Sequence, residues 1–62
     1  ELEEPYGSLL GENDAASEFF RAQPPSYRKA ISWWIVSAKR EVTRQKRLQK
    51  LIDESARGRR LR

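Results

Sequence analysis

The stretch that most constrains the fold is residues 23–40, QPPSYRKAISWWIVSAKR, where a proline pair leads into an unbroken apolar stripe. Proline fits the first turn of a helix, because its missing N–H would find no partner there, and it disfavours helix in the residue before it. The stretch therefore predicts a new helix beginning near Ser26. The stripe recurs at helical spacing and consists of Tyr27, Ala30, Ile31, Trp34, Ile35 and Ala38.

The two adjacent tryptophans occupy different sides of this expected helix. Trp34 lies at the centre of the stripe, so we expect it in the core. Trp33 lies roughly 120° from that centre, beside Lys29, and either covers a helix edge or belongs to a contact surface. Val36 is expected on the opposite, polar side of the helix.

A helix is expected on each side of this one. The first begins near Asp14, with Asp14 or Asn13 as its cap, and ends before Pro24. The other covers roughly residues 42–57 and stops at Gly58. The expected apolar residues of these two helices are Ala15, Ala16, Phe19 and Phe20 in the first, and Leu48, Leu51, Ile52 and Ala56 in the last.

The boundary between the second and third helices carries no glycine or proline. One continuous helix over residues 26–57 is therefore compatible with the pattern, and it would be roughly 48 Å long with little to pack on except a partner chain. A bend near residues 40–42 instead lets both apolar stripes pack against the first helix. We favour the bend, and with it a monomer.

These elements predict an all-α fold, a small three-helix bundle over residues 14–58. Residues 1–13 are expected to be an irregular N-terminal arm or linker, with about one helical turn near Ser8, and residues 59–62 a frayed basic tail. Thr43 is expected to cap the third helix, and Arg44 and Arg47 to reach an acid such as Glu12, Asp14 or Glu18, or a carbonyl. The expected core and architectural residues are Phe19, Phe20, Tyr27, Ile31, Trp34, Ile35, Thr43, Arg44, Leu48, Leu51 and Ile52.

Composition removes several classes of function. The 62 residues include no histidine and no cysteine, which excludes disulfides, thiolate metal sites and imidazole catalysis, and we expect no metal and no cofactor. No apolar run approaches the roughly 20 residues that span a membrane, and the acidic start lacks the apolar core of a signal peptide, so we expect a cytoplasmic protein. Because the initiator methionine is missing, we expect a piece of a longer protein.

Charge is divided unevenly along the chain. Residues 1–25 carry six acidic residues and one arginine, whereas residues 26–62 carry twelve lysines or arginines and three acidic residues. This division indicates either solvated faces that pair with one another or an anionic partner for the second half.

The segment FFRAQPPSYRKAISWWIVSAKREVTRQKRL resembles the C-terminal helical domain of the YdeI/OmpD-associated family, whose members are often labelled bacteriocin-protection proteins. The resemblance spans roughly residues 16–60 without gaps. Glu41 and Val42 stand where the family usually has Pro-Glu, and Trp33 stands where it has a polar residue. The matching residues are Phe19, Phe20, Pro24, Pro25, Ser26, Arg28, Trp34, Ile35, Ala38, Lys39, Arg40, Thr43, Arg44, Arg47 and Leu48.

The resemblance implies a role in resistance to bacteriocins or envelope stress, and a small β-rich domain preceding this one. It supplies no reaction and no catalytic residues. We therefore expect a non-enzymatic interaction module whose partner is that preceding domain or another protein. Weak nucleic-acid binding by the basic third helix is the alternative, and a membrane-surface helix is a further one. The expected partner-contact surface consists of Trp33, Lys29, Arg40 and Arg47.

Overall fold

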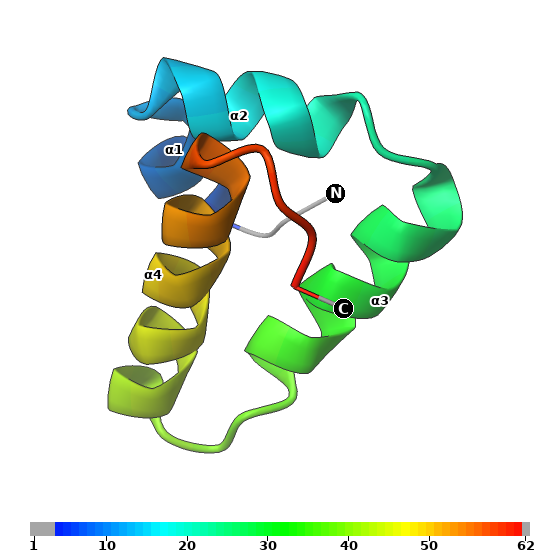
Figure 1. The fold of residues 1–62 in the computed structure, drawn as a ribbon. Coiled ribbons are helices and arrows are strands. Elements are labelled where there is room, and N and C mark those ends of the chain that lie inside the picture. Colours follow the sequence, from blue (N-terminus) through cyan, green and yellow to red (C-terminus); the bar gives the residue numbers. More distant parts are fainter. Residues whose placement is uncertain (1–3, 62) are drawn as a thin grey trace.

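The computed structural model describes residues 4–61, and four helices follow one another in this part of the chain. They are α1 (Tyr6–Gly11), α2 (Asp14–Arg21), α3 (Pro25–Val36) and α4 (Glu41–Ala56). Figure 1 shows α2 running across one end of the molecule, with α3 and α4 descending from it on opposite sides. The all-α prediction is confirmed, and the described residues contain no strand.

The boundaries of α2 and α3 follow from local chemistry. Asn13, in an extended conformation, caps α2, because its side-chain Oδ1 accepts the backbone N–H of Ala16 at 3.0 Å. The chain leaves α2 after Arg21 and enters α3 at Pro25, with Pro24 as the preceding cap residue. The proline pair therefore separates the two helices as the sequence predicts.

The bend between the last two helices is present. The helix α3 ends at Val36 and α4 begins at Glu41, so the chain turns over residues 37–40, slightly before the expected position. Arg40 adopts an extended conformation with φ −94° and ψ 139°, which starts α4 in a new direction. Residues 26–57 therefore do not form one continuous helix.

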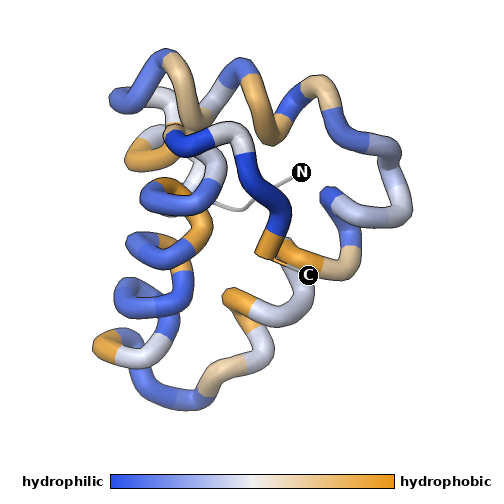
Figure 2. The backbone as a smooth tube through the Cα atoms, viewed as in Figure 1, coloured by the Kyte–Doolittle hydropathy of each residue, from blue (hydrophilic) through white to orange (hydrophobic). Residues whose placement is uncertain are grey.

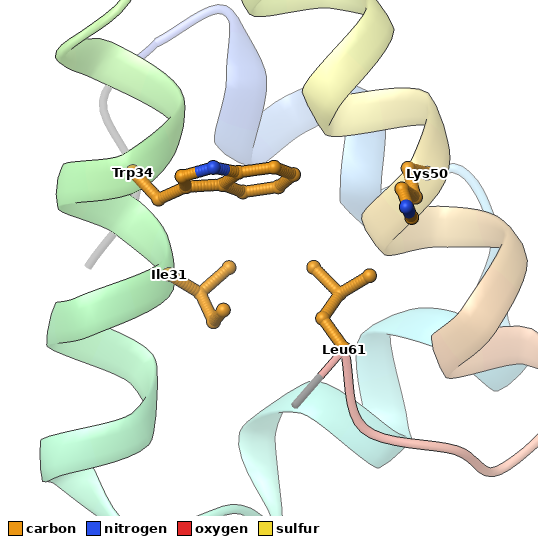
Figure 3. A pocket seen from close by; sticks show the side chains of 4 residues that line it. All are labelled: Ile31, Trp34, Lys50 and Leu61. Atoms are coloured by element: carbon orange, nitrogen blue, oxygen red, sulfur yellow. The ribbon is translucent and has the colours of Figure 1, made fainter.

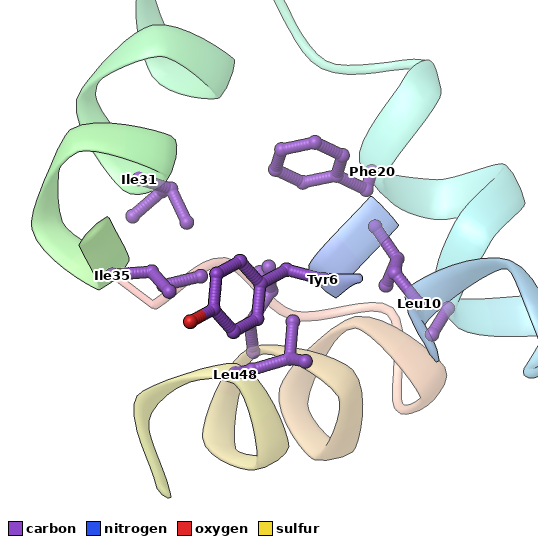
Figure 4. Close-up of a cluster of buried hydrophobic side chains, with 8 residues drawn as sticks. Tyr6, Leu10, Phe20, Ile31, Ile35 and Leu48 are labelled. Carbon is purple, nitrogen blue, oxygen red and sulfur yellow. The ribbon is translucent and has the colours of Figure 1, made fainter. Parts of the chain in front are cut away.

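The hydrophobic core lies where the four helices meet. Figure 2 shows apolar residues on the inward sides of the helices, and Figure 4 shows the ring of Tyr6 among side chains from α1, α2, α3 and α4. Ser55 is also buried, although Ala56 was expected there, because residues 48, 51 and 55 share one side of α4. The buried core residues are Tyr6, Leu10, Ala16, Phe20, Ile31, Ile35, Leu48 and Leu51.

The expectation of three helices with an irregular arm needs correction. Residues 6–11 of the expected arm form α1, which packs against α2 and α4. Tyr6 and Leu10, one helical turn apart, are 4% and 5% exposed. The expected arm therefore supplies two core residues, whereas Leu9, between them on another side of α1, is exposed.

In the expected frayed tail, residues 59–61 are also ordered, and residue 62 lies outside the described residues. Gly58 has a positive φ of 73°, and the N–H groups of Gly58 and Arg59 bond to the carbonyls of Ser55 and Glu54, each at 2.9 Å. This is a Schellman motif, which ends α4 and reverses the chain. Residues 59–61 then run back toward α3 (Figure 1), where Leu61 packs against the core.

Candidate functional site

The outer face of α3 presents one large aromatic side chain. Trp33 is 70% exposed, the most exposed of the large apolar side chains in the described part of the molecule. Lys29 and Ala30 are exposed one turn before it, and Ser37 is exposed one turn after it. Ala30 was expected to belong to the inner stripe, but it lies at the edge that faces solvent. The small side chains of Ala30 and Ser37 leave the indole of Trp33 accessible.

Trp34 lies on the other side of the same helix. Its side chain is half-buried and packs against the core, and Figure 3 shows the indole extending from α3 toward α4. The guanidinium of Arg47 stacks over this ring with its carbon 5.1 Å from the ring centroid. One backbone step therefore separates an exposed tryptophan from one that is held between helices.

Two arginines of α4 bind the end of α3. Arg47 donates from Nη1 to the carbonyl of Trp34, and Arg44 donates from Nε to the carbonyl of Ala38 at 2.7 Å. Carbonyls in the last turn of a helix lack partners within the helix, and charged donors bind them well. Arg44 therefore uses a carbonyl, the second of its two expected kinds of partner, rather than Glu12, Asp14 or Glu18.

The expected partner-contact surface is only partly contiguous. Trp33 and Lys29 lie together on α3, and Arg40 is exposed in the connection that follows it. Arg47 is directed toward Trp34 and the inside of the molecule, away from Trp33. The surface that the structure presents is therefore Trp33 with Lys29 and Ala30, which we call the α3 outer face.

The remaining expected architectural residues occupy a range of positions. Phe20 is buried and its ring centroid lies 6.3 Å from that of Tyr27, whereas Phe19 is half-buried. Tyr27 and Ile52 are half-buried against the core. Thr43 is half-buried within the first turn of α4, not at its cap, because the cap residue is Arg40. Val36, expected on a polar side, packs against the core at the last position of α3.

Sequence reasoning missed the part played by Tyr6. Its hydroxyl donates to Oε1 of Glu41 at 2.7 Å, which joins α1 to the first turn of α4. The available signal was the spacing of Tyr6 and Leu10, two apolar residues at i and i+4. Pro5, Gly7 and Gly11 concealed it, because their presence favoured a linker.

In the described residues, two side chains that could take part in catalysis form hydrogen bonds to the backbone of this chain instead. The hydroxyl of Tyr27 accepts the N–H of Leu61 at 3.0 Å, and Arg44 is bound to a carbonyl. Among residues 4–61, no three His, Cys, Asp or Glu side chains gather closely enough to hold a metal ion. Over the same range, no helix has both the length and the apolar character to cross a membrane.

Comparison with known proteins identifies the family. The model of the family described as bacteriocin-protection, YdeI or OmpD-associated matches residues 1–58. The chain belongs to this family. The matched residues include α1, so the family's pattern extends over the helix that sequence reasoning assigned to an arm. Searches among curated proteins and among solved structures find no match.

Proposed function

We propose that this chain is a non-enzymatic interaction module that contributes to bacteriocin protection by binding another protein through the α3 outer face. Family membership supports the protective role. The proposal of a binding role rests on one observation, that Trp33 is 70% exposed on a regular helix. Aromatic residues are enriched at the centres of protein interfaces, where their burial supplies much of the binding free energy.

The neighbours of Trp33 define the chemistry of this partner. Ala30 and Ser37 are small, so a partner can approach the α3 helix closely around the indole. Lys29 lies one turn away, and Lys39 and Arg40 are exposed just beyond the end of α3. A matching partner has an apolar pocket for the indole and acidic residues at the rim of that pocket.

The side-chain chemistry supports a binding role over catalysis. The sequence has neither imidazole nor thiol groups, the commonest general bases and nucleophiles. The Tyr27 hydroxyl and the Arg44 guanidinium, two groups that could serve chemistry, bind the backbone of this chain instead.

The positions of the arginines favour a protein partner over a nucleic acid. Arg44 and Arg47 lie in the middle of the basic stretch of α4, but both guanidinium groups donate to carbonyls of α3 or its following turn. They are therefore directed away from a phosphate backbone that would lie along the outside of α4.

A bacteriocin-survival assay with surface variants tests this proposal. Cells that lack the gene are complemented with wild type, Trp33→Ala, Lys29→Glu or Lys46→Glu, and then challenged with bacteriocin. We expect Trp33→Ala and Lys29→Glu to abolish most of the protection. Lys46→Glu is the matched control, because Lys46 is exposed on α4, outside the α3 outer face. Circular dichroism of each purified variant shows whether folding is retained.

Photo-crosslinking identifies the molecule that binds the α3 outer face. A benzophenone amino acid at position 33 should give one discrete protein adduct in cells, and Lys29→Glu should reduce that adduct. The same probe at position 46 should not give it. Full protection by folded Trp33→Ala, or an adduct at position 33 that consists of nucleic acid, would contradict the proposal. An adduct only within a single polypeptide would assign the face to a preceding domain.

A further inference from the structure

A cavity of about 200 Å³ lies between α3, α4 and the C-terminal segment, away from Trp33. Its lining residues are Ile31 and Trp34 of α3, Lys50 of α4 and Leu61. Figure 3 shows the indole of Trp34 along one side of the space, Ile31 and Leu61 on the adjacent sides, and Lys50 opposite on α4. The site therefore combines three apolar side chains with one cation.

The C-terminal wall of this cavity is held by specific contacts. The N–H of Leu61 donates to the Tyr27 hydroxyl at 3.0 Å. Arg60 stacks over the Tyr27 ring at 5.2 Å and donates from Nε to Oε1 of Gln23 at 2.6 Å. These contacts position Leu61 against the core and give the cavity a defined side.

The charge of Lys50 has no partner within residues 4–61. Asp53, at helix-pair spacing from Lys50, accepts a hydrogen bond from Gln49 at 2.9 Å instead. No hydrogen bond or ion pair of the described residues involves the Lys50 ammonium. Lys50 is exposed to solvent while it lines the cavity, so it can bind an anionic group at the mouth.

We propose that this cavity binds a small aromatic carboxylate. A cavity of roughly 150 Å³ with apolar walls is sufficient for benzene, so this one has room for a single ring. The ring would pack against Trp34, Ile31 and Leu61, and aromatic pairs add to the free energy of apolar burial. The carboxylate would lie at Lys50. Apolar walls and one unpaired cation select this class over neutral or cationic molecules.

This site is separate from the proposed protein interface. Trp33 and Lys29 do not line the cavity, and Lys50 lies on a different helix from them. Failure of ligand binding would therefore leave the role of the α3 outer face untouched, and the reverse also holds.

The experiment uses benzoate and its neutral analogue benzyl alcohol as probes. Trp33→Phe leaves Trp34 as the single tryptophan, so its fluorescence reports on the cavity wall. Methyl NMR shifts of Ile31 and Leu61 provide a second readout. We expect saturable changes with benzoate in both. Lys50→Gln should lower the affinity for benzoate roughly tenfold and change the affinity for benzyl alcohol by less than about twofold.

Two further variants sharpen the result. Lys46→Gln removes an exposed lysine of the same helix that does not line the cavity, and it should leave both affinities unchanged. Leu61→Ala removes one apolar wall of the cavity and should lower the affinity for both ligands. The proposal is overturned if the fluorescence and the NMR shifts change linearly with benzoate, without saturation, up to roughly 50 mM. This concentration is far above a dissociation constant of about 1 mM. Equal weakening by Lys46→Gln and Lys50→Gln, or no effect of Leu61→Ala, would overturn it as well.

Discussion

The two sides of α3 lie in opposite environments, the inner one packed in the core and the outer one exposed to solvent. On the inner side, Ile31 and Ile35 are 2% and 0% exposed, and Trp34 packs between α3 and α4. On the outer side, Trp33 is 70% exposed and no described element covers it. An aromatic residue that a small domain leaves in water contributes little to its folding, and we propose that Trp33 serves binding instead.

The inner side is held by residues of α1, α4 and the C-terminal segment. The α4 arginines bind the carbonyls of Trp34 and Ala38, Tyr6 of α1 lies beside Ile35 and Leu48 (Figure 4), and Leu61 closes the C-terminal edge. Under the proposed function, stability and recognition would lie on opposite faces of one helix. Mutations on the two faces should separate these properties.

The largest expected effect on folding comes from Trp34→Ala. This change removes apolar packing between α3 and α4 and the ring on which Arg47 stacks. We expect the free energy of unfolding to fall by about 3 kcal/mol, near the lower end for tryptophan truncations because the side chain is only half-buried. Urea denaturation followed by circular dichroism measures it. A loss no larger than that of Trp33→Ala would remove the distinction between the two faces.

Arg47→Gln tests how α4 holds the end of α3. It removes a charged donor to the Trp34 carbonyl and the contact with the Trp34 ring. We expect a loss of about 1.5 kcal/mol of unfolding free energy. Arg40→Gln is the matched control, because Arg40 is exposed and its side chain makes no cap hydrogen bond, and its effect should stay within about 0.5 kcal/mol. Equal effects of the two changes in denaturant melts would show that the Arg47 contacts contribute little.

The central part of the fold was predictable because its signals are local. The proline pair marks the start of α3, and the period of the apolar stripe places Ile31, Ile35 and Trp34 inward and Trp33 outward. Gly58 marks the stop of α4, where it takes a positive φ. Each of these features depends on a few neighbouring residues.

The ends of the chain were not predictable in the same way. Tyr6 packs in the shared core while Glu41, 35 residues away, accepts its hydroxyl, and Leu61 donates to the hydroxyl of Tyr27, 34 residues away. A local pattern of Pro5, Gly7 and Gly11 indicates a linker, and only these distant partners make it a packed helix. The cavity and the separation of Arg47 from Trp33 likewise depend on how α3 and α4 meet, which periodicity does not specify.

Tyr6→Phe tests whether α1 belongs to the cooperative core on the inner side of α3. The ring and its burial are kept, and only the hydrogen bond to Glu41 is lost. We expect a loss of about 1 kcal/mol of unfolding free energy. When Tyr6→Phe is made in the Glu41→Gln variant, the loss of unfolding free energy should be smaller, because the amide is a weaker acceptor than the carboxylate. A double-mutant cycle with no coupling between the two positions would show that this hydrogen bond does not form in solution.

The smallest expected effect on stability is that of Trp33→Ala. The side chain is exposed on the outer side of α3, so its removal should change the unfolding free energy by no more than about 0.5 kcal/mol.

We also expect the chain to be a monomer, since the inner stripes of α3 and α4 are buried within one molecule. Light scattering across a range of concentrations checks this for wild type and variant. A wild-type dimer that Trp33→Ala dissociates would show that a second copy occupies the outer face. A large loss of stability in a monomeric variant would show that Trp33 covers a helix edge. Unchanged stability together with lost bacteriocin protection is the result that separates the two faces of α3 as folding and binding surfaces.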